Sequence, residues 1–478
     1  MKKDFSFEIN ARGDKNFPLM RAGKIKTPHG EIKTPTFIVV GTHAEVKFLS
    51  PQNLRKAGSQ VMLSNGYHLL RRAIMIDAAG GLAEFNGWRG PTFTDSGGFQ
   101  VMSLGSGLGK IVSMDKSEEN YNEKFDSSKK IAEKKSTQDE LIEKENLKDE
   151  KEEKLAFVFD DGVEFRDPFS SRIVKFTPEM SIETQHKIGA DVMMAFDELT
   201  NIEDSYEYNV EALERTKKWA ERSLSEHIRQ TNLRPNKPYQ ALYGCLQGAM
   251  FRDLREKAAR DLAEMQINGI EFDGFGLGGA FEKENLGEIL TWMTQILPEE
   301  KPRHLLGLAR PDDIFIGVEN GADTFDCVAP TREARHGRIY TLDGNINLRR
   351  AEFAADENVL DKECDCATCT KNIDEILTDF MTENLENYVT NDVKKYHEKS
   401  DFKNIFYGEF NLLPEQNISR KVLRALLKSK NVEFRAFAFT LLSQHNVRFV
   451  VRLTEQIREA IIEGNYAEFK ANFVARYY

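Results

Sequence analysis

The chain has 478 residues, a hydrophobic content of 40% and a formal net charge of −11, which together predict a soluble protein with a large core. It contains no apolar stretch of the roughly 18 residues that a membrane-spanning helix needs, and its start, MKKDFSFEIN, lacks the apolar core of a secretory signal. Five cysteines, three of them close together, are not a disulfide framework and indicate a cytoplasmic protein.

The negative charge is concentrated in two segments. Residues 115–154 hold 14 acidic side chains against 10 lysines, and residues 371–410 hold 9 against 5. The rest of the chain is close to neutral and includes basic clusters such as RPNKP and TREARHGR. The net charge therefore does not exclude a nucleic-acid partner.

Short apolar runs recur along the chain and are separated by helical patterns, which predicts alternating strands and helices and hence a parallel sheet. Eight such runs favour a closed (β/α)8 TIM barrel of the α/β class over an open sheet. In chain order the runs are TFIVVGT, QVMLSN, PTFTDSGG, ADVMMAFDE, YQALYGCLQG, FDGFGLGG, RHLLGLA and ADTFDCVAP.

The segment 105–155 interrupts the barrel pattern. It is too charged to bury a core, so we interpret it as a disordered or solvated insertion, and its opening GSGLGK lacks the spacing of a phosphate-binding loop. We predict that residues 1–104 form the first part of the barrel and residues 156–345 the rest. Residues 346–478 are predicted to form a metal-binding subdomain and C-terminal helices, with an acidic insertion at about 371–417.

Polar residues follow several of the predicted strands. Asp95, Asp197 and Asp326 each end one strand, and the pairs Gln247–Gly248 and Gly278–Gly279 end two others. In a barrel these carboxyl ends form one mouth, where catalytic groups gather. A carboxylate there can act as nucleophile, general acid/base or acceptor for a substrate N–H, whereas a single aspartate more often caps a helix. Three aspartates beside glycine pairs favour a catalytic site.

The stretch ECDCATC places Cys364, Cys366 and Cys369 within six positions, a spacing that suits tetrahedral zinc. Two downstream histidines can supply a fourth ligand. His397 follows Cys369 after 27 intervening residues, and His445 lies in an apolar helical segment. Three protein ligands would indicate a catalytic zinc ion, whereas four would indicate a structural one.

The motifs TDSGGFQVMSL, FDE, LQG, GLGG and FDCVAPTREARHGRIYT, followed by CDCATC, occur in this order along the chain. Together with GTHAEVKFLSPQNL and SNGYHLL, they resemble the bacterial form of the tRNA-guanine transglycosylase family. The resemblance covers nearly all of the chain outside the two charged segments. It implies a (β/α)8 barrel with a C-terminal zinc subdomain, which agrees with the strand pattern.

The resemblance implies an enzyme that exchanges the wobble guanine of certain tRNAs for a 7-deazaguanine. In bacteria this base is usually 7-aminomethyl-7-deazaguanine, a queuosine precursor. By motif, Asp326 would be the nucleophile that attacks ribose C1′, and Asp95 the general acid/base. The base would be bound by Asp95, Ser96, Gly97, Gly98, Phe99, Asp197, Gln247 and Gly279. Two loops would face the RNA: Gly307, Leu308, Ala309, Arg310, Pro311, Asp312 and Asp313, and then Thr331, Arg332, Glu333, Ala334 and Arg335.

The resemblance also implies one structural Zn²⁺, held by Cys364, Cys366, Cys369 and His445, so that His445 rather than His397 completes the cluster. Members of the family act on the tRNA anticodon loop in the cytoplasm, commonly as homodimers. A membrane partner is not expected.

The sequence departs from the family pattern near the expected pocket. Ala249 and Ala280 stand where glycine and leucine are common, Gly66 where threonine is usual, and His304 and Leu306 where tyrosine and methionine are common. Queuine is therefore an alternative incoming base. A non-catalytic, zinc-stapled tRNA-binding subunit is a further alternative, against which the three aspartates argue.

Overall fold

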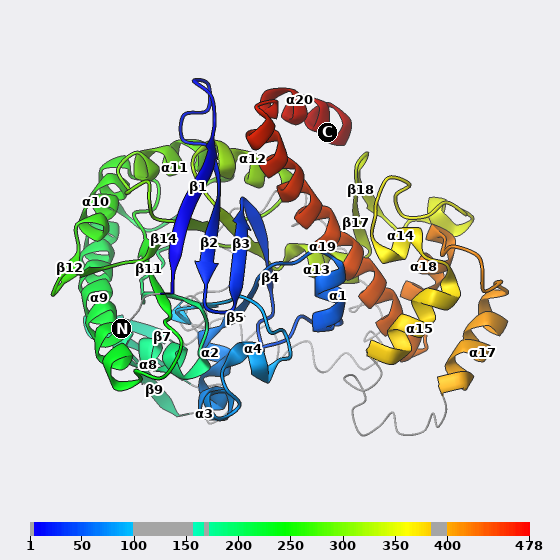
Figure 1. Cartoon of the computed structure of the whole chain (residues 1–478), viewed down its shortest axis with the longest axis horizontal. Coiled ribbons are helices and arrows are strands. Elements are labelled where there is room, and N and C mark those ends of the chain that lie inside the picture. Colours follow the sequence, from blue (N-terminus) through cyan, green and yellow to red (C-terminus); the bar gives the residue numbers. More distant parts are fainter. Residues whose placement is uncertain (1–3, 99–155, 167–171, 384–398) are drawn as a thin grey trace, which may run out of the picture.

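Eight parallel strands form a closed barrel in the order β10-β11-β14-β15-β16-β4-β5-β6 (Figure 1). The computed structural model describes residues 4–98, 156–166, 172–383 and 399–478. All eight apolar runs predicted as strands coincide with barrel strands, so the predicted (β/α)8 barrel is confirmed. The strands are β4 Thr36–Val40, β5 Met62–Asn65, β6 Thr92–Asp95, β10 Val192–Met194, β11 Ala241–Leu246, β14 Gly274–Leu277, β15 Arg303–Leu305 and β16 Thr324–Cys327.

Successive side chains of the barrel strands point alternately outward, to the helices, and inward. In β4, Phe37 and Val39 belong to the buried cluster that includes the surrounding helices. Ile38, between them, packs in the second cluster with Phe93 and Tyr243 of other strands. Because both faces of each strand are buried, the strands read as continuous apolar runs rather than as alternating ones.

Amphipathic helices surround the barrel. In α10, Leu254, Ala258 and Leu262 are buried at four-residue spacing, while most of the charged residues face outward. Polar side chains cap several helix starts, as Thr177 does by accepting from the Met180 N–H of α8. The helices that follow barrel strands are α1 Pro51–Lys56, α2 Gly66–Leu69, α3 Ala73–Ala78, α4 Leu82–Phe85, α8 Pro178–Ile188, α9 Tyr206–Leu233, α10 Arg252–Ala263, α11 Leu286–Thr294, α12 Pro311–Glu319 and α13 Ala329–His336.

Among the described residues, three smaller sheets accompany the barrel and a fourth, two-stranded sheet belongs to the C-terminal part. The sheet of β1 (Ser6–Arg12), β2 (Arg21–Thr27) and β3 (Gly30–Thr34) covers the amino end of the barrel, where Ile25 and Ile32 join the interior cluster. The other two contain β7 Ala156–Phe159, β8 Gly162–Arg166 and β9 Ile173–Phe176 in one, and β12 Gln266–Ile267 and β13 Ile270–Glu271 in the other.

Three aspartates just before barrel strands hold the amino end of the barrel together. Each carboxylate accepts a hydrogen bond of 2.7–2.9 Å from a backbone N–H at the start of the neighbouring strand: Asp191 from Thr92, Asp273 from Leu242 and Asp323 from Arg303. These hydrogen bonds link adjacent strands at the point where the backbone hydrogen bonds between them begin.

The C-terminal part forms a second buried cluster beside the barrel, built around a long helix, α19, that also packs on the barrel (Figure 1). The cluster includes the three cysteines of the predicted metal site. Its elements and the helix that returns along the barrel are β17 Arg338–Thr341, β18 Gly344–Asn347, α14 Ala367–Thr370, α15 Ile373–Glu383, α17 Lys399–Phe410, α18 Arg420–Lys428, α19 Val432–Glu463 and α20 Tyr466–Tyr477.

The described part of the predicted acidic insertion at 371–417 contributes the helices α15 and α17 to this cluster. Phe380 packs against Phe437 with ring centroids 4.8 Å apart, and Phe402 and Phe406 lie against Phe434 at 5.5 and 5.7 Å. These phenylalanines explain why so charged a segment folds onto the subdomain. Residues 384–398, and all of the insertion predicted at 105–155, lie outside the described residues.

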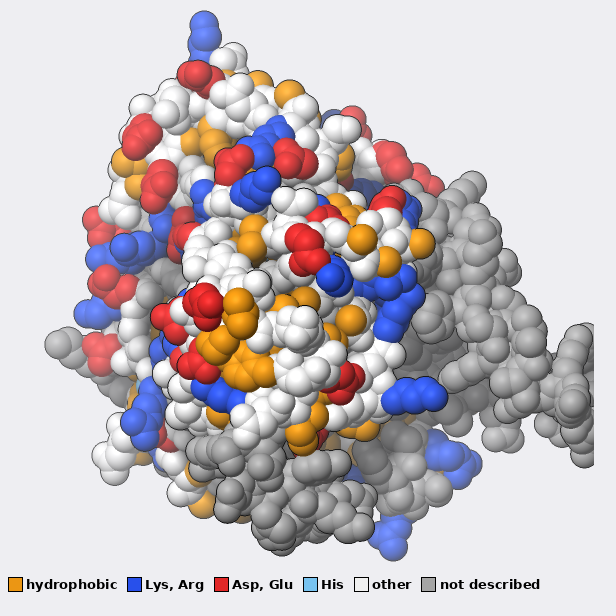
Figure 2. All heavy atoms as spheres, turned by 90° about the vertical axis from the view of Figure 1, so that its right-hand side faces the viewer, with side chains coloured by type: hydrophobic (Ala, Val, Ile, Leu, Met, Phe, Trp, Pro, Cys, Tyr) orange, Lys and Arg blue, Asp and Glu red, His pale blue; other side chains and the backbone are white. Residues whose placement is uncertain are grey.

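Figure 2 faces this subdomain and shows acidic and basic side chains around a group of hydrophobic ones. Ile405, Leu413 and Val432 are among the exposed apolar residues of the subdomain. In the part of the chain that the structure describes, no helix combines the length and apolarity needed to cross a membrane.

Arg21 and Asp323 join the covering sheet to the barrel through a buried ion pair. The guanidinium donates twice to the carboxylate, at 2.9 and 2.6 Å, and the two side chains are 3% and 0% exposed. Replacing Arg21 by Met leaves Asp323 buried without its cation, so we expect the free energy of unfolding to fall by about 3–5 kcal/mol in urea titrations.

Arg12→Met is the matched control for that experiment. Arg12 pairs with Glu299 at 2.8 Å, but its side chain is 52% exposed and its partner 67% exposed. An exposed pair of this kind contributes less than about 1 kcal/mol. Equal losses of stability in the two variants would contradict a special role for the buried pair.

Candidate active site and metal cluster

The structure places Asp95, Asp197 and Asp326 at the carboxyl end of the barrel. Asp95 is the last residue of β6, Asp326 is the third residue of β16, and Asp197 follows the end of β10 by three residues. The Ser96 hydroxyl donates to Asp197 Oδ1 at 3.3 Å, which connects the loops after β6 and β10. The three carboxylates therefore share one mouth, as their positions after the strands predicted.

Asp95 is held by three hydrogen bonds. Its Oδ1 accepts from the N–H groups of Gly66, at 2.9 Å, and Gly97, at 3.1 Å, and its Oδ2 accepts from Asn65 Nδ2 at 2.6 Å. Burial raises the pKa of Asp95 to about 7 although these hydrogen bonds lower it, and the nearby charge of Asp326 raises it further. Near neutral pH the carboxyl group can therefore either give or take a proton.

Asp197 and Gln247 form a second polar pair. Gln247 Nε2 donates to Asp197 Oδ2 at 2.6 Å. Burial raises the pKa of Asp197 to about 6, against the lowering effect of the hydrogen bonds from Gln247 and Ser96. Gln247 Oε1 is buried and has no hydrogen-bond partner among the described residues. A buried acceptor of this kind calls for a donor, and a bound molecule with an N–H edge would supply one.

Arg255 connects the loops that carry Gln247 and Gly279. It is fully buried in α10, and it donates from Nε to the carbonyl of Ala249 at 2.7 Å and from Nη1 to that of Gly278 at 2.5 Å. Burial lowers the pKa of Arg255 to about 9. Gly279 has φ +114°, and a Cβ there would overlap Arg255 Nη2. Only glycine fits at this position.

Asp326 lies beneath the loop after β15. Its Oδ1 accepts a hydrogen bond of 2.9 Å from the Gly307 N–H, and His304 Nε2 lies 3.2 Å from the same oxygen. The Asp326 side chain is 13% exposed, so it is accessible from the mouth of the barrel.

The remaining residues predicted to bind the base lie beside Asp95. Gly98 donates its N–H to Ser96 Oγ at 3.2 Å, and Gly97 has φ +79° with its α-carbon close to Tyr67. Phe99, also predicted to bind the base, lies outside the described residues.

The two segments predicted to be RNA-facing loops flank the same mouth, since one follows β15 and the other follows β16. Only residues 307–310 form a loop: Pro311 begins α12, and residues 331–335 lie within α13. Arg332 is exposed, and Arg310 approaches Glu333 at 3.6 Å. Burial and the charge of Arg332 lower the pKa of Arg335, whose Nη1 has no hydrogen-bond partner among the described residues. Five other residues in these segments are buried: Ala309, Pro311, Asp313, Thr331 and Ala334.

Cys364, Cys366, Cys369 and His445 form a buried cluster whose four potential ligand atoms lie within 4.8 Å of one another. His445 Nδ1 is 3.4 Å from the Sγ atoms of Cys366 and Cys369, and Nε2 lies 2.7 Å from the carbonyl oxygen of Tyr340. That carbonyl requires the ring proton on Nε2 and leaves Nδ1 free to bind a metal. The cluster is compatible with a tetrahedral zinc site.

The helix α19 supplies the histidine of this cluster. The next residue, Asn446, accepts from the Tyr340 N–H at 3.1 Å and donates to the carbonyl oxygens of Pro330 and Arg338, each at 3.0 Å. His445 is therefore held in a rigid buried frame. The competing candidate, His397, lies outside the described residues.

Sequence reasoning did not single out Asn65 and Arg255, and it noted His304 only as a departure from the family pattern. Asn65 ends β5 beside Asp95, to which it is the cross-strand neighbour, so the polar end of QVMLSN was a usable signal. Arg255 lies in a helix with an ordinary amphipathic pattern, and no sequence feature indicates that its side chain points into the protein.

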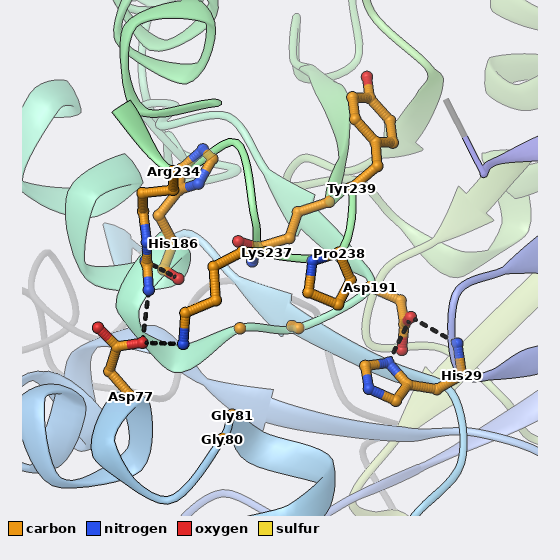
Figure 3. Close-up of a pocket in the computed structure, with 13 residues that line it drawn as sticks. His29, Asp77, Gly80, Gly81, His186, Asp191, Arg234, Lys237, Pro238 and Tyr239 are labelled. Carbon is orange, nitrogen blue, oxygen red and sulfur yellow. Dashed lines mark hydrogen bonds and ion pairs between the residues drawn. The ribbon is translucent and has the colours of Figure 1, made fainter. Parts of the chain in front are cut away.

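A separate cavity lies at the opposite, amino end of the barrel (Figure 3). Its charged groups pair with one another: Arg234 and Lys237 both bind Asp77, and His29 Nδ1 lies 2.8 Å from Asp191 Oδ1. These pairings satisfy the lining residues without a ligand, so the cavity is a poor candidate for a binding site.

Comparison with known proteins places these features in a family. The family model described as queuine tRNA-ribosyltransferase matches residues 18–143, 147–388 and 400–478. An Archaeoglobus fulgidus protein with the provisional name queuine tRNA-ribosyltransferase is 37% identical over 95% of this chain and 96% of its own length. Proteins named queuine tRNA-ribosyltransferase from Desulforamulus reducens and Streptococcus pneumoniae are 34% and 35% identical over 95% and 96% of this chain, and over 94% and 93% of their own lengths.

Proposed function

The chain belongs to the queuine tRNA-ribosyltransferase family, and we propose that it is a tRNA-guanine transglycosylase that exchanges the wobble guanine of tRNA for a 7-deazaguanine. The observation that carries the proposal is the pair of carboxylates at the barrel mouth. Burial raises the pKa of Asp95 to about 7, and the charge of Asp326 acts on it in the same direction. A neutral acid beside a second carboxylate provides a proton donor and a nucleophile at one site.

In the first displacement, an oxygen of the Asp326 carboxylate attacks ribose C1′ and the bond from C1′ to guanine breaks. The bonding electron pair leaves with the base, and protonated Asp95 gives the base a proton. The product is a covalent Asp326–ribose intermediate in an RNA strand that remains intact.

In the second displacement, the incoming base loses a proton to the Asp95 carboxylate and attacks C1′. The electron pair of the C1′–oxygen bond returns to Asp326. Because two displacements occur at one carbon, the original stereochemistry is restored, as in retaining glycosidases.

Asp197, Gln247 and Gly279 would read the edge of the base in this scheme. The carboxylate of Asp197 accepts N–H groups, and Gln247 Oε1 is a buried acceptor that no described residue satisfies. Arg255 sets the distance between the loops after β11 and β14. The wobble nucleotide must leave its stack to reach this depth, as bases in RNA loops do on many proteins.

The loop after β15 and the helix α13, which carry Arg310, Arg332 and Arg335, flank the mouth and would bind the anticodon loop. Arg332 is exposed, and Arg335 keeps a guanidinium nitrogen without a described partner, so both can pair with phosphate or with flanking bases. We place the reaction in the cytoplasm and expect a homodimer, as the family resemblance implies.

The metal cluster would hold one structural Zn²⁺. Four protein ligands close a tetrahedral shell and leave no position for water, so the ion would stabilise the subdomain and take no part in the chemistry. The aspartates at the barrel mouth belong to a different part of the fold.

Asp326→Asn tests the nucleophile. An amide is a poor nucleophile, so we expect guanine exchange to fall at least about 1,000-fold and covalent trapping of tRNA to disappear, with tRNA affinity nearly unchanged. Trapping is measured on denaturing gels and exchange with labelled guanine. Asp343→Asn, a change at an exposed turn residue bound to Arg476, is the control and should trap normally.

Trapping by Asp326→Asn at the wild-type level would refute the assignment of the nucleophile. A wild-type protein that binds tRNA but incorporates no labelled guanine would refute the enzyme and favour a non-catalytic tRNA-binding subunit.

The incoming base is tested by competition between 7-aminomethyl-7-deazaguanine and queuine. We expect the aminomethyl base to be incorporated with the higher kcat/KM, because the motifs resemble the bacterial form of the family. Mass spectrometry of the modified tRNA identifies the product. Preferential incorporation of queuine, the base in the printed names of the relatives, would reverse this assignment.

His445→Ala tests the metal site. We expect bound zinc to fall from about one ion per chain to near zero and the Tm to drop, because one of four ligands is lost from a buried cluster. His397→Ala is the matched comparison and should retain zinc. Loss of zinc from the His397 variant alone would show that His397 is the fourth ligand.

A further inference from the structure

His304 lies inside the barrel in contact with the predicted nucleophile. It is the central residue of β15, its side chain is fully buried, and Nδ1 is 2.9 Å from Thr324 Oγ1 of the neighbouring strand. Phe93 packs edge to face against the ring, with centroids 5.6 Å apart. These contacts fix the ring plane with Nε2 3.2 Å from Asp326 Oδ1.

This approach is close but not aligned. Although 3.2 Å is within reach of a hydrogen bond, Nε2 makes no hydrogen bond of good geometry with any described residue. A fully buried ring nitrogen without a partner is costly and rare in folded proteins. Hydrogen bonds of active sites are often long or misaligned without substrate and tighten when the reacting groups are in place. The position of Nε2 beside Asp326 fits a hydrogen bond that tightens only when the reacting groups are in place.

We propose that His304 is a positioning residue for Asp326, which holds Oδ1 through Nε2–H so that Oδ2 is the oxygen that attacks ribose C1′. The proposal rests on the proposed function. The observation behind it is that Asp326 Oδ1 has two neighbours that can donate a hydrogen bond, the Gly307 N–H at 2.9 Å and His304 Nε2 at 3.2 Å. No hydrogen bond to Oδ2 is found among the described residues.

The Thr324 hydroxyl, which can donate or accept, is compatible with the tautomer that this role requires. When the hydroxyl donates to Nδ1, the neutral ring carries its proton on Nε2, facing Asp326. In that case the Thr324 hydroxyl pairs with Nδ1 and the Nε2–H group faces Asp326 Oδ1, so each ring nitrogen faces one polar neighbour. In the proposed role the imidazole donates a hydrogen bond and transfers no proton.

The two donors would act in both displacements. When Oδ2 bonds to C1′, Oδ1 becomes the carbonyl oxygen of the intermediate and remains bound to Gly307 and His304. When the incoming base attacks, the C1′–Oδ2 electron pair returns to the carboxylate, and the same donors stabilise the charge that develops there. His304 thus orients the nucleophile in the first displacement and assists its departure in the second.

A matched pair of variants separates this role from core packing. Glutamine places an amide N–H about as far from Cβ as Nε2 is, and its carbonyl can accept from Thr324. Methionine has similar length and volume but no donor. We therefore compare His304→Gln with His304→Met in guanine exchange, measuring kcat, the KM for tRNA, and the single-turnover rate of covalent trapping.

We expect His304→Met to lower kcat and the trapping rate by about 10- to 100-fold, the effect of losing one hydrogen bond to a charged group, with the KM for tRNA changed less than about threefold. His304→Gln should recover most of that loss. Two outcomes would overturn the proposal: kcat in the methionine variant near the wild-type value, or equal losses in the two variants when circular dichroism shows both folded.

His186→Leu controls for the removal of a buried imidazole. His186 faces His227 at 3.1 Å and lines the amino-end cavity, away from the carboxylates. It should lose stability without a change in kcat per folded molecule. If His304→Met does not fold, the glutamine variant decides alone: exchange within about tenfold of wild type supports the donor role, and a larger loss contradicts it.

Wild-type exchange activity separates this proposal from the proposed function. Failure of the wild-type protein to exchange guanine would refute the function itself. Normal wild-type exchange combined with an unaffected methionine variant would refute only the role of His304.

Discussion

The structure depends on the pairing of β16 with β4, strands that lie nearly at opposite ends of the barrel sequence. Asp326 pairs in register with Ile38, and Thr324 with Thr36, which closes a parallel sheet on itself. In a closed parallel barrel all carboxyl ends point the same way, so the residues that end the strands meet at one mouth. Without this closure β16, which carries Asp326, would be an edge strand of an open sheet and would be separated from Asp95 on β6 by the intervening strands, so no joint chemistry would be available to the two carboxylates.

Aspartates occupy both ends of the barrel but experience opposite environments. At the amino end, Asp323 accepts N–H groups and pairs with Arg21, so its charge is compensated inside the protein. At the carboxyl end, Asp95 and Asp197 accept hydrogen bonds only from neutral groups, and burial raises their pKa values to about 7 and about 6. A buried carboxylate that is paired with a cation stabilises the fold, whereas a carboxyl group buried without a cation titrates near neutral pH.

The metal cluster and the mouth of the barrel are connected through α19. His445 belongs to the cluster, while the adjacent Asn446 donates to the carbonyl of Pro330, just before the predicted RNA-facing residues 331–335. The Tyr340 backbone contacts both side chains, through its carbonyl to His445 and its N–H to Asn446. A metal ion that stabilises the subdomain would therefore also fix the position of the start of α13, next to the residues predicted to face RNA.

The choice of His445 over His397 as the fourth member of the metal cluster rested on the resemblance to a family. The sequence by itself determined the eight strands, the helices between them, the aspartates at strand ends and the three cysteines of the cluster. Each of these follows from local patterns, because apolar runs, Cys-x-Cys-x2-Cys spacing and long motifs are read within a few residues of one another. Only the tertiary structure decided that Arg255 joins two loops, that His304 faces Asp326, and that the phenylalanines of the acidic segment 371–417 pack onto the subdomain. These depend on contacts between residues far apart in the chain, and the direction of a buried side chain is set by the neighbours that folding supplies.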